Sequence, residues 1–349
     1  MKYSISIKIE NYEVNSFEYG NFSNELTKRL AHKKTLKKYE LSLLGYKYLF
    51  NYYNYSNLKK ETYLYPKLDS SLTCIFCLNS EPVVSFNNKP HVIPFFLGNK
   101  YLLHYQECDK CNAYFSSNLE DALDKYTAVF RTIGRIKNRK KKITAVTSLN
   151  NKFSYNFNAV FGAFEIQGES YDKYIRDDGL GNLEIKFDIK KHRPSDVFKG
   201  FMKIFYGLLP PEHRKNFNNL RRWIMDPNPN NFLIKPVKIV RTFMPDFKDY
   251  PLFINILHTE DSFKENNNSY DYIGLIAFGN IIYEMPIISD IFLKYANELK
   301  QQNQTLNFQL KLQPKPVSPV ETKIIDLSIT DKVTDSFSVF FSYSERVKI

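Results

Sequence analysis

The sequence predicts an α+β protein in which a four-cysteine module separates a short N-terminal part from a long C-terminal part. Three observations support this fold class. Hydrophobic residues make up 43% of the 349 residues, enough to bury a sizeable core. Strand-like alternation dominates the second half, with fewer amphipathic helical stretches. All four cysteines occur in two CxxC pairs. We expect parts at residues 1–70, 71–142 and 143–349.

The N-terminal part begins with a predicted strand, YSISIKI at residues 3–9. One or two helices are predicted over residues 24–55, because Leu36, Leu43 and Phe50 fall on one apolar stripe. The basic face of this stretch is typical of a solvated helix surface and also suits phosphate contacts. The first residues lack the apolar core of a secretory signal, and no run of eighteen apolar residues occurs. We therefore expect a cytoplasmic protein with no membrane span.

The cysteines have the spacing of a metal knuckle. Cys74 and Cys77 form one pair, and Cys108 and Cys111 form the second pair after a long excursion. Four thiolates spaced in this way predict a tetrahedral, structural Zn²⁺ site with no open coordination position. A reducing compartment argues against disulfides. The alternative, four buried free cysteines, does not explain the paired spacing.

The excursion and the exit of the knuckle carry a longer pattern. The excursion contains KPHVIPFFLGN at residues 89–99, and the exit reads CDKCNAYFSSNLE at residues 108–120. Taken in order, CIFC, HVIP, the Leu-Gly step and CDKCN resemble the zinc-stabilised branch of the HNH endonuclease superfamily. The resemblance covers roughly residues 72–125. It implies a treble-clef-like ββα-metal module, in which a β-hairpin carries a histidine and a helix carries the last motif residue.

The resemblance also implies roles for single residues. His91 matches the first motif histidine, which takes a proton from the attacking water, and a neutral imidazole suits that role near pH 7. Asn112 matches the last motif position, beside a catalytic Mg²⁺ or Mn²⁺ that is distinct from the zinc. Asn99 and His104 are both candidates for the middle position, whose usual function is to brace the loop.

One departure concerns the residue before His91. Many members of the family place an acidic ligand of the catalytic cation there, whereas this chain has Pro90. A hard cation needs oxygen ligands, so another carboxylate must replace it. We expect Glu120, about two helical turns past Asn112, to do so. The acidic residues close enough in sequence to supply a ligand are Glu107, Asp109, Glu120, Asp121 and Asp124.

The charge of the chain predicts an acidic partner. The formal net charge is +12, and seven basic residues cluster within twelve positions after the cysteine segment. We expect this cluster to bind DNA, or alternatively RNA, through backbone phosphates, although a solvated basic loop has the same composition. The cluster consists of Arg131, Arg135, Lys137, Arg139, Lys140, Lys141 and Lys142.

The C-terminal part predicts an antiparallel sheet packed against one or two helices. Alternating stretches predict strands at 153–166 and 182–189, and a helix is predicted over 194–210 from one apolar face. A second helix is predicted over 212–225. Further strands are predicted at 232–243, 252–258, 272–287, 305–312, 323–329 and 335–343.

Together these features predict a metal-dependent HNH endonuclease that hydrolyses DNA. The resemblance implies a bacterial setting in phage defence or restriction, with a second copy of the chain or a defence-system protein as a further partner. Two alternatives remain open. One is a zinc-containing module that binds nucleic acid without cutting it, which Pro90 favours. The other is a protein–protein adaptor in which the knuckle only stabilises the fold.

Overall fold

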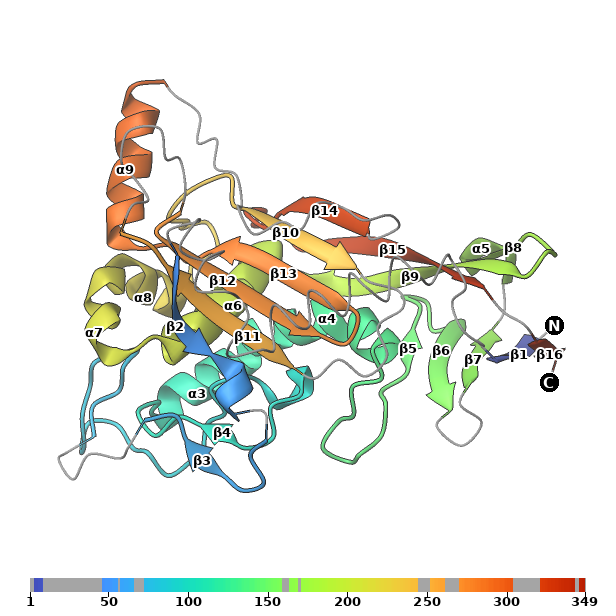
Figure 1. The fold of residues 1–349 in the computed structure, drawn as a ribbon, viewed down its shortest axis with the longest axis horizontal. Coiled ribbons are helices and arrows are strands. Elements are labelled where there is room, and N and C mark those ends of the chain that lie inside the picture. The colour runs from blue at the N-terminus through green and yellow to red at the C-terminus, as the bar shows by residue number, and fades with distance from the viewer. Residues whose placement is uncertain are drawn as a thin grey trace.

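The computed structural model describes residues 3–8, 46–55, 57–65, 72–158, 163–168, 171–243, 252–260, 270–303, 321–342 and 345–348. Over these residues the protein is a mixed α/β structure with several antiparallel sheets and few helices (Figure 1). This agrees with the predicted α+β class. None of the helices in the described part of the chain has the length and apolar composition that crossing a lipid bilayer requires.

The largest sheet has six strands, and every neighbouring pair is antiparallel. Its central strands are rich in Ile, Phe and Tyr, which suit a pleated surface that is covered on both faces. In spatial order the strands are β14 (Glu321–Asp326), β10 (Lys238–Phe243), β13 (Ile281–Pro286), β12 (Tyr272–Phe278), β11 (Phe253–His258) and β2 (Lys47–Asn51). The predicted strand at 305–312 lies outside the described residues.

Strand β2 corrects the helical prediction for residues 24–55. Residues 47–51 pair with β11 at the edge of the sheet, and a 3-10 turn follows over Tyr52–Tyr55. Aromatic and large apolar residues favour a strand once a partner edge is available, and that partner lies some two hundred positions further along the chain. The rest of the predicted helical stretch, residues 24–45, lies outside the described residues.

Two smaller sheets contain most of the remaining strands. The five-stranded sheet has the order β16 (Glu345–Lys348), β1 (Tyr3–Lys8), β7 (Ala163–Gly168), β6 (Phe153–Asn158) and β5 (Val146–Thr147). The three-stranded sheet has the order β15 (Val333–Ser342), β9 (Asn182–His192) and β8 (Ile175–Asp177). The strands expected at 3–9, 182–189 and 335–343 are thus present, and the stretch 153–166 divides into the hairpin β6–β7.

Helix α6 (Pro194–Leu208) lies against the six-stranded sheet and confirms the helix predicted over 194–210. The ring of Phe205 sits so close to Gly274 of β12 that a Cβ atom there would be 2.4 Å from it, which explains the glycine. The ring of Phe201 contacts Tyr283 of β13 at 5.1 Å. The helix is apolar nearly all round, which is typical of a helix buried between layers.

The second predicted helix, over 212–225, is interrupted. It divides into α7 (Pro211–Arg214), a 3-10 turn over Lys215–Phe217, and α8 (Asn218–Met225). The only tryptophan, Trp223, packs inward from α8 and donates its indole N–H to the carbonyl of Asn231. The other described helices outside the cysteine segment are α5 (Tyr171–Tyr174) and α9 (Asp290–Gln301).

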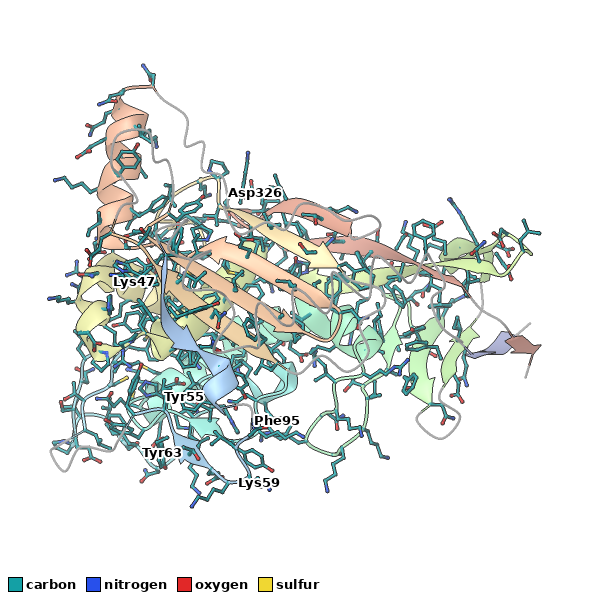
Figure 2. The ribbon with its side chains drawn as sticks, viewed as in Figure 1. Lys47, Tyr55, Lys59, Tyr63, Phe95 and Asp326 are labelled. Carbon is teal, nitrogen blue, oxygen red and sulfur yellow. The ribbon has the colours of Figure 1, made fainter. Side chains whose placement is uncertain are left out.

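The cysteine segment packs on α6 from the side opposite the large sheet. Its exit helix, α3 (Asp109–Phe115) and α4 (Asp121–Ile133), runs beside α6 and continues toward the three-stranded sheet (Figure 1). Phe130 of α4 meets Phe337 of β15 at 4.9 Å. The hydrophobic core is continuous from the cysteine segment through α6 to the sheets. Figure 2 labels Phe95 and Tyr63 at the end of the molecule that carries this segment, away from Asp326.

Candidate functional site

The four cysteine sulfurs lie within 4.8 Å of one another. Two of the sulfur–sulfur distances, Cys74 to Cys111 and Cys77 to Cys108, are 3.8 Å. Sulfurs at the corners of a tetrahedron around zinc, each at a Zn–S bond length of ~2.3 Å, are ~3.8 Å apart. The same distance is far too long for a disulfide, and all four cysteines are free. The donor set therefore fits one tetrahedral zinc ion.

Local backbone structure brings the sulfurs together. The first pair sits in a tight turn, in which the N–H of Leu78 donates to the carbonyl of Cys74 and Leu78 has a positive φ of 63°. In the second pair, Cys108 is the N-cap of α3 and Cys111 lies in its first turn. A turn facing a helix N-terminus presents two sulfurs from each side. This is the arrangement that the CxxC spacing predicted.

The electrostatics of the cysteines also fit a bound cation. The pKa of Cys74 is lowered to about 5, chiefly by the hydrogen bond between its sulfur and that of Cys111. Burial raises the pKa of Cys108 to about 11, and the pKa of Cys111 is raised far above its usual value by its bond to Cys74. By itself the cluster thus stabilises one thiolate among thiols. A divalent ion at the centre allows all four sulfurs to ionise.

The excursion places His91 on an extended segment opposite Leu103. The two residues form an antiparallel bridge, and Val92 and His104 donate their N–H groups to Leu102 and Pro90. Leu103 belongs to the short strand β4 (Leu102–Leu103), which pairs in parallel with β3 (Thr62–Tyr63). The chain therefore runs from one extended segment, through a second, into helix α3. His91 is half-buried, and among the described residues its Nδ1 atom has no hydrogen-bond partner.

The two candidates for the middle motif position differ in their contacts. Asn99 is fully buried, donates its amide N–H groups to the carbonyls of Ile93 and Leu102, and accepts from the N–H of Leu102. It therefore braces the whole excursion. His104 is also buried, and its Nδ1 accepts from the N–H of Gln106. Burial holds the pKa of His104 well below its usual value, so this ring is neutral.

The exit of the knuckle contains a π-helical turn. Residues Ser116–Glu120 form this turn between α3 and α4, and all three pieces make one continuous helix. Such turns often occur at functional sites, because the extra residue re-aims the side chains beyond it. Asn112 is half-buried on α3, one turn before Ser116. Ser116 and Glu120 line a pocket, whereas Asn112 does not.

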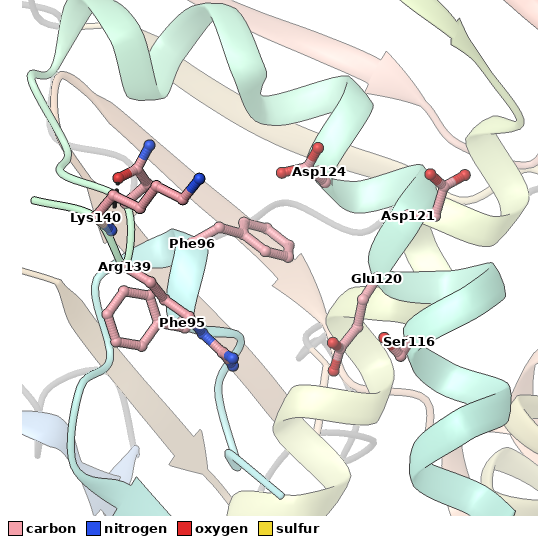
Figure 3. A pocket seen from close by; sticks show the side chains of 9 residues that line it. Phe95, Phe96, Ser116, Glu120, Asp121, Asp124, Arg139 and Lys140 are labelled. Carbon is pink, nitrogen blue, oxygen red and sulfur yellow. Dashed lines mark hydrogen bonds between the residues drawn. The ribbon is translucent and has the colours of Figure 1, made fainter. Parts of the chain in front are cut away.

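The pocket has a volume of about 690 Å³ and two walls of opposite character (Figure 3). The helix supplies Ser116 and the acidic residues of one wall, while Phe95, Phe96 and the basic loop supply the other. In Figure 3 the Phe96 ring points from its loop toward the helix, and the Arg139 guanidinium extends beside the Phe95 ring. The complete lining is Phe95, Phe96, Ser116, Glu120, Asp121, Asp124, Asn138, Arg139 and Lys140.

The seven predicted phosphate-binding residues fall into two groups. The side chains of Arg131 and Arg135 contact other residues of the protein. Arg131 pairs with Asp124 at 2.6 Å and lies over the Phe96 ring, while Arg135 lies 4.3 Å from the ring centre of Phe157. The other five belong to a tight exposed loop held by Asn138, whose Oδ1 accepts two backbone N–H groups. These five are Lys137, Arg139, Lys140, Lys141 and Lys142.

His91 lies among charges that act in opposite directions. Its pKa is lowered from the ordinary value of 6.5, first by burial and next by Arg139 and Lys203, while Glu120 and Glu61 oppose the shift. The ring of His91 also contacts Phe95, a pocket residue, at 5.8 Å. The structure thus brings His91 and Glu120, predicted separately, into one electrostatic environment beside the pocket. A neutral imidazole at this place can accept a proton.

The five acidic candidates have distinct surroundings. Asp109 is half-buried and accepts backbone N–H groups from the loop at 87–88. Asp121 pairs with Lys125, and Asp124 with Arg131. Glu107 is buried and pairs with Lys203 of α6 at 3.2 Å. Glu120 both lines the pocket and accepts from the same lysine at 3.1 Å.

Lys203 is the residue of this site that the sequence reasoning missed. Lys203 lies far from the cysteine pattern in the chain. It belongs to a helix that was predicted from its apolar face, and that face does not indicate that a lysine of the helix contacts the site. The only signal was a lysine within a strongly apolar helical stretch, FKGFMKIF. Buried lysines are almost always paired, so burial of this lysine implies an acidic partner, although the sequence does not say which one.

Comparison with known families agrees with the motif reading. Residues 74–127 match the family model of the HNH endonucleases. This segment, which we call the HNH segment, contains the four cysteines, His91, Asn112 and Glu120, and it is similar to the HNH endonucleases. No match was found among the curated proteins or among the solved structures with which the chain was compared. The six-stranded sheet and α6 lie outside the matched segment.

Proposed function

We propose that the protein is a metal-dependent HNH endonuclease that hydrolyses phosphodiester bonds in DNA. The observation that carries this proposal is the position of His91. It lies beside a two-walled pocket, within the electrostatic reach of Glu120 and Arg139, and inside a segment that matches the HNH family. The antiparallel bridge between His91 and Leu103, followed by α3, supports the proposal of a ββα-metal module.

His91 and Glu120 have different roles in the proposed reaction. A nitrogen of the neutral His91 ring takes a proton from water, and the hydroxide oxygen forms a bond to phosphorus. The P–O bond on the opposite side breaks, and the departing oxygen takes up a proton. Glu120 supplies a carboxylate oxygen for a divalent cation in place of the acid that Pro90 replaces. When bound, Mg²⁺ or Mn²⁺ stabilises negative charge on the phosphate and on the departing oxygen.

The other parts of the site support these steps. The exposed basic loop, from Lys137 to Lys142, faces the pocket with Arg139 and Lys140 and would hold backbone phosphates there. Asn99 keeps the excursion rigid, so that His91 stays in place. Asn112 would orient water or the cation from α3. A tetrahedral zinc ion in the cysteine cage has a structural role and leaves the catalytic cation separate.

The test is a nicking assay with a matched histidine control. Purified protein is incubated with supercoiled plasmid and either Mg²⁺ or Mn²⁺, beside His91→Ala and His213→Ala. We expect His91→Ala to lower the nicking rate by about 10²–10⁴-fold, the usual contribution of a general base. His213 lies against His258 and Tyr272, away from the pocket lining, so its variant should retain activity. Equal nicking by both variants would reject the assignment of His91.

A second candidate function is a zinc-containing protein that binds nucleic acid without cutting it. The observation that favours it is Pro90, because the proline side chain has no ligand atom at the position where many HNH nucleases have an acidic ligand of the catalytic cation. In that case plasmid is retained but never nicked, and His91→Ala binds as the parent does. The setting implied by the resemblance, phage defence or restriction in a bacterial cytoplasm, is tested by plaque counts on a host expressing parent or His91→Ala.

A further inference from the structure

Helix α6 contributes one charged side chain to the centre of the HNH segment. The ammonium of Lys203 lies 3.2 Å from Glu107 Oε2 and 3.1 Å from Glu120 Oε1. It also lies 5.3 Å from the centre of the Phe115 ring. The side chains of Lys203 and Glu107 are both only 2% exposed, whereas that of Glu120 is 22% exposed. Lys203 is outside the segment that matches the HNH family.

The two partners of Lys203 come from opposite ends of α3. Glu107 directly precedes Cys108, and Glu120 ends the π-helical turn. An ammonium that is buried this deeply is costly unless it is paired on all sides. Apart from Lys199 and Ser195, the other buried side chains of α6 are apolar or are glycine and tyrosine, so a methionine or leucine at position 203 would fill the space without that cost. The position of this charge therefore points to a role beyond packing.

The side chain of Glu120 faces both the interior and the pocket. One carboxylate oxygen accepts from Lys203 in the interior, and the same side chain lines the pocket beside His91. Without the ammonium, the carboxylates of Glu107 and Glu120 would face each other with no positive charge between them. Like charges at such close range repel strongly when they are shielded from water. Glu120 would then turn away into solvent, and the pocket would lose the Glu120 carboxylate, leaving Asp121 and Asp124.

We propose that Lys203 is a positioning residue of the HNH site, which holds Glu120 so that its carboxylate faces the pocket and receives a divalent cation. This inference deepens the proposed function and rests on it for the role of Glu120. It also gives the contact between the HNH segment and α6 a functional role. Lys203 belongs to α6, so the site depends on a residue outside the matched segment.

The test compares two buried lysines of the same helix. Lys203→Met removes the ammonium at similar volume. Lys199→Met is the matched control, because Lys199 is equally buried one turn earlier but donates to the carbonyl of Asp226 and lies over Trp223. The full-length, zinc-loaded variants are titrated with Mn²⁺, and bound Mn²⁺ is measured by electron paramagnetic resonance. Plasmid nicking is measured in parallel.

We expect Lys203→Met to weaken Mn²⁺ binding by about 10–100-fold, the usual effect of losing the partner that orients a metal ligand. Lys199→Met should bind Mn²⁺ as the parent does. In a Glu120→Gln background, Lys203→Met should cause little further loss, because the lysine acts through that carboxylate. If Lys203→Met does not fold, the double variant Lys203→Met/Glu107→Gln removes both buried charges together and should still show the weakened binding.

The outcomes separate this inference from the proposed function. If the parent binds Mn²⁺ and cuts no nucleic acid, the nuclease proposal fails. The positioning role of Lys203 is then tested by the Mn²⁺ affinity of Lys203→Met alone. If Lys203→Met binds Mn²⁺ and nicks as Lys199→Met does, the positioning role is overturned while the nuclease stands. If the parent binds no Mn²⁺, or if the two substitutions at 203 and 120 have additive effects, the inference is likewise overturned.

Discussion

At the scale of single residues, the proposed chemistry depends on His91 and the charges around it. A general base acts in its neutral form, which predominates above its pKa. Burial and Arg139 lower the pKa of His91 below 6.5, so the acid limb of the rate profile should have its midpoint below that value. The lowered pKa thus favours a neutral His91 imidazole at physiological pH, although carboxylates lie nearby.

The contribution of Arg139 can be measured separately. Arg139→Gln removes a positive charge that disfavours protonation of the ring, so the pKa of His91 should rise and the acid limb of the nicking rate should move to higher pH. Lys141→Gln is the control, because Lys141 lies on the same exposed loop and does not shift the pKa of His91. A lower rate with an unmoved acid limb would show that Arg139 acts only on the substrate.

At the scale of single elements, the basic loop is the part of the protein that we propose binds a nucleic acid. Its tip is fixed by Asn138, and Lys141 and Lys142 are exposed there. Each phosphate that a protein neutralises makes the slope of log K against log salt steeper by about 0.9. The variant Lys141→Ala/Lys142→Ala should therefore have a shallower salt dependence, by about 0.9 for each phosphate that the loop no longer binds.

The control for the loop prediction has the same change of net charge. The variant Lys190→Ala/Lys191→Ala removes two exposed lysines from β9, on the three-stranded sheet. Binding of both variants to a short duplex is measured by fluorescence anisotropy over a range of salt. If both change the slope equally, the net charge of the protein and not the loop governs binding.

At the scale of the whole molecule, the HNH segment and α6 share one core. The backbone carbonyl of Leu119 and the side chain of Leu123 lie directly against Gly200 of α6, and Phe76 contacts both Phe115 and Tyr206. Loss of zinc should therefore destabilise α6 as well as the cysteine segment, because ion binding and folding of the segment are coupled.

Hydrogen exchange measures how far this effect reaches. In Cys74→Ser, we expect the amides of residues 72–125 to lose protection and those of α6 to lose part of theirs. Low solubility of this variant would be consistent with the same effect, and His91→Ala should exchange as the parent does. If α6 keeps full protection while the knuckle opens, the segment folds independently of the rest of the chain.

Several features were predictable because they depend on local spacing. The paired cysteines, the position of His91 in the excursion and the apolar face of α6 each follow from residues a few positions apart. The strand β2 was missed, because its conformation depends on pairing with β11, far along the chain. The π-helical turn was missed as well, since one extra residue in a helix leaves no pattern that spacing can detect.

By itself the sequence determined the kind of site: a sulfur cage, a histidine and an HNH segment, because the ligands and their spacing are written within one short stretch. Only the tertiary structure decided which carboxylates line the pocket and what holds Glu120 there. Lys203 reaches Glu107 and Glu120 because α6 packs beside α3, and Arg139 reaches Phe95 because its loop folds back on the excursion. Charges interact through space, and the distances that set their strength arise only when the core has formed.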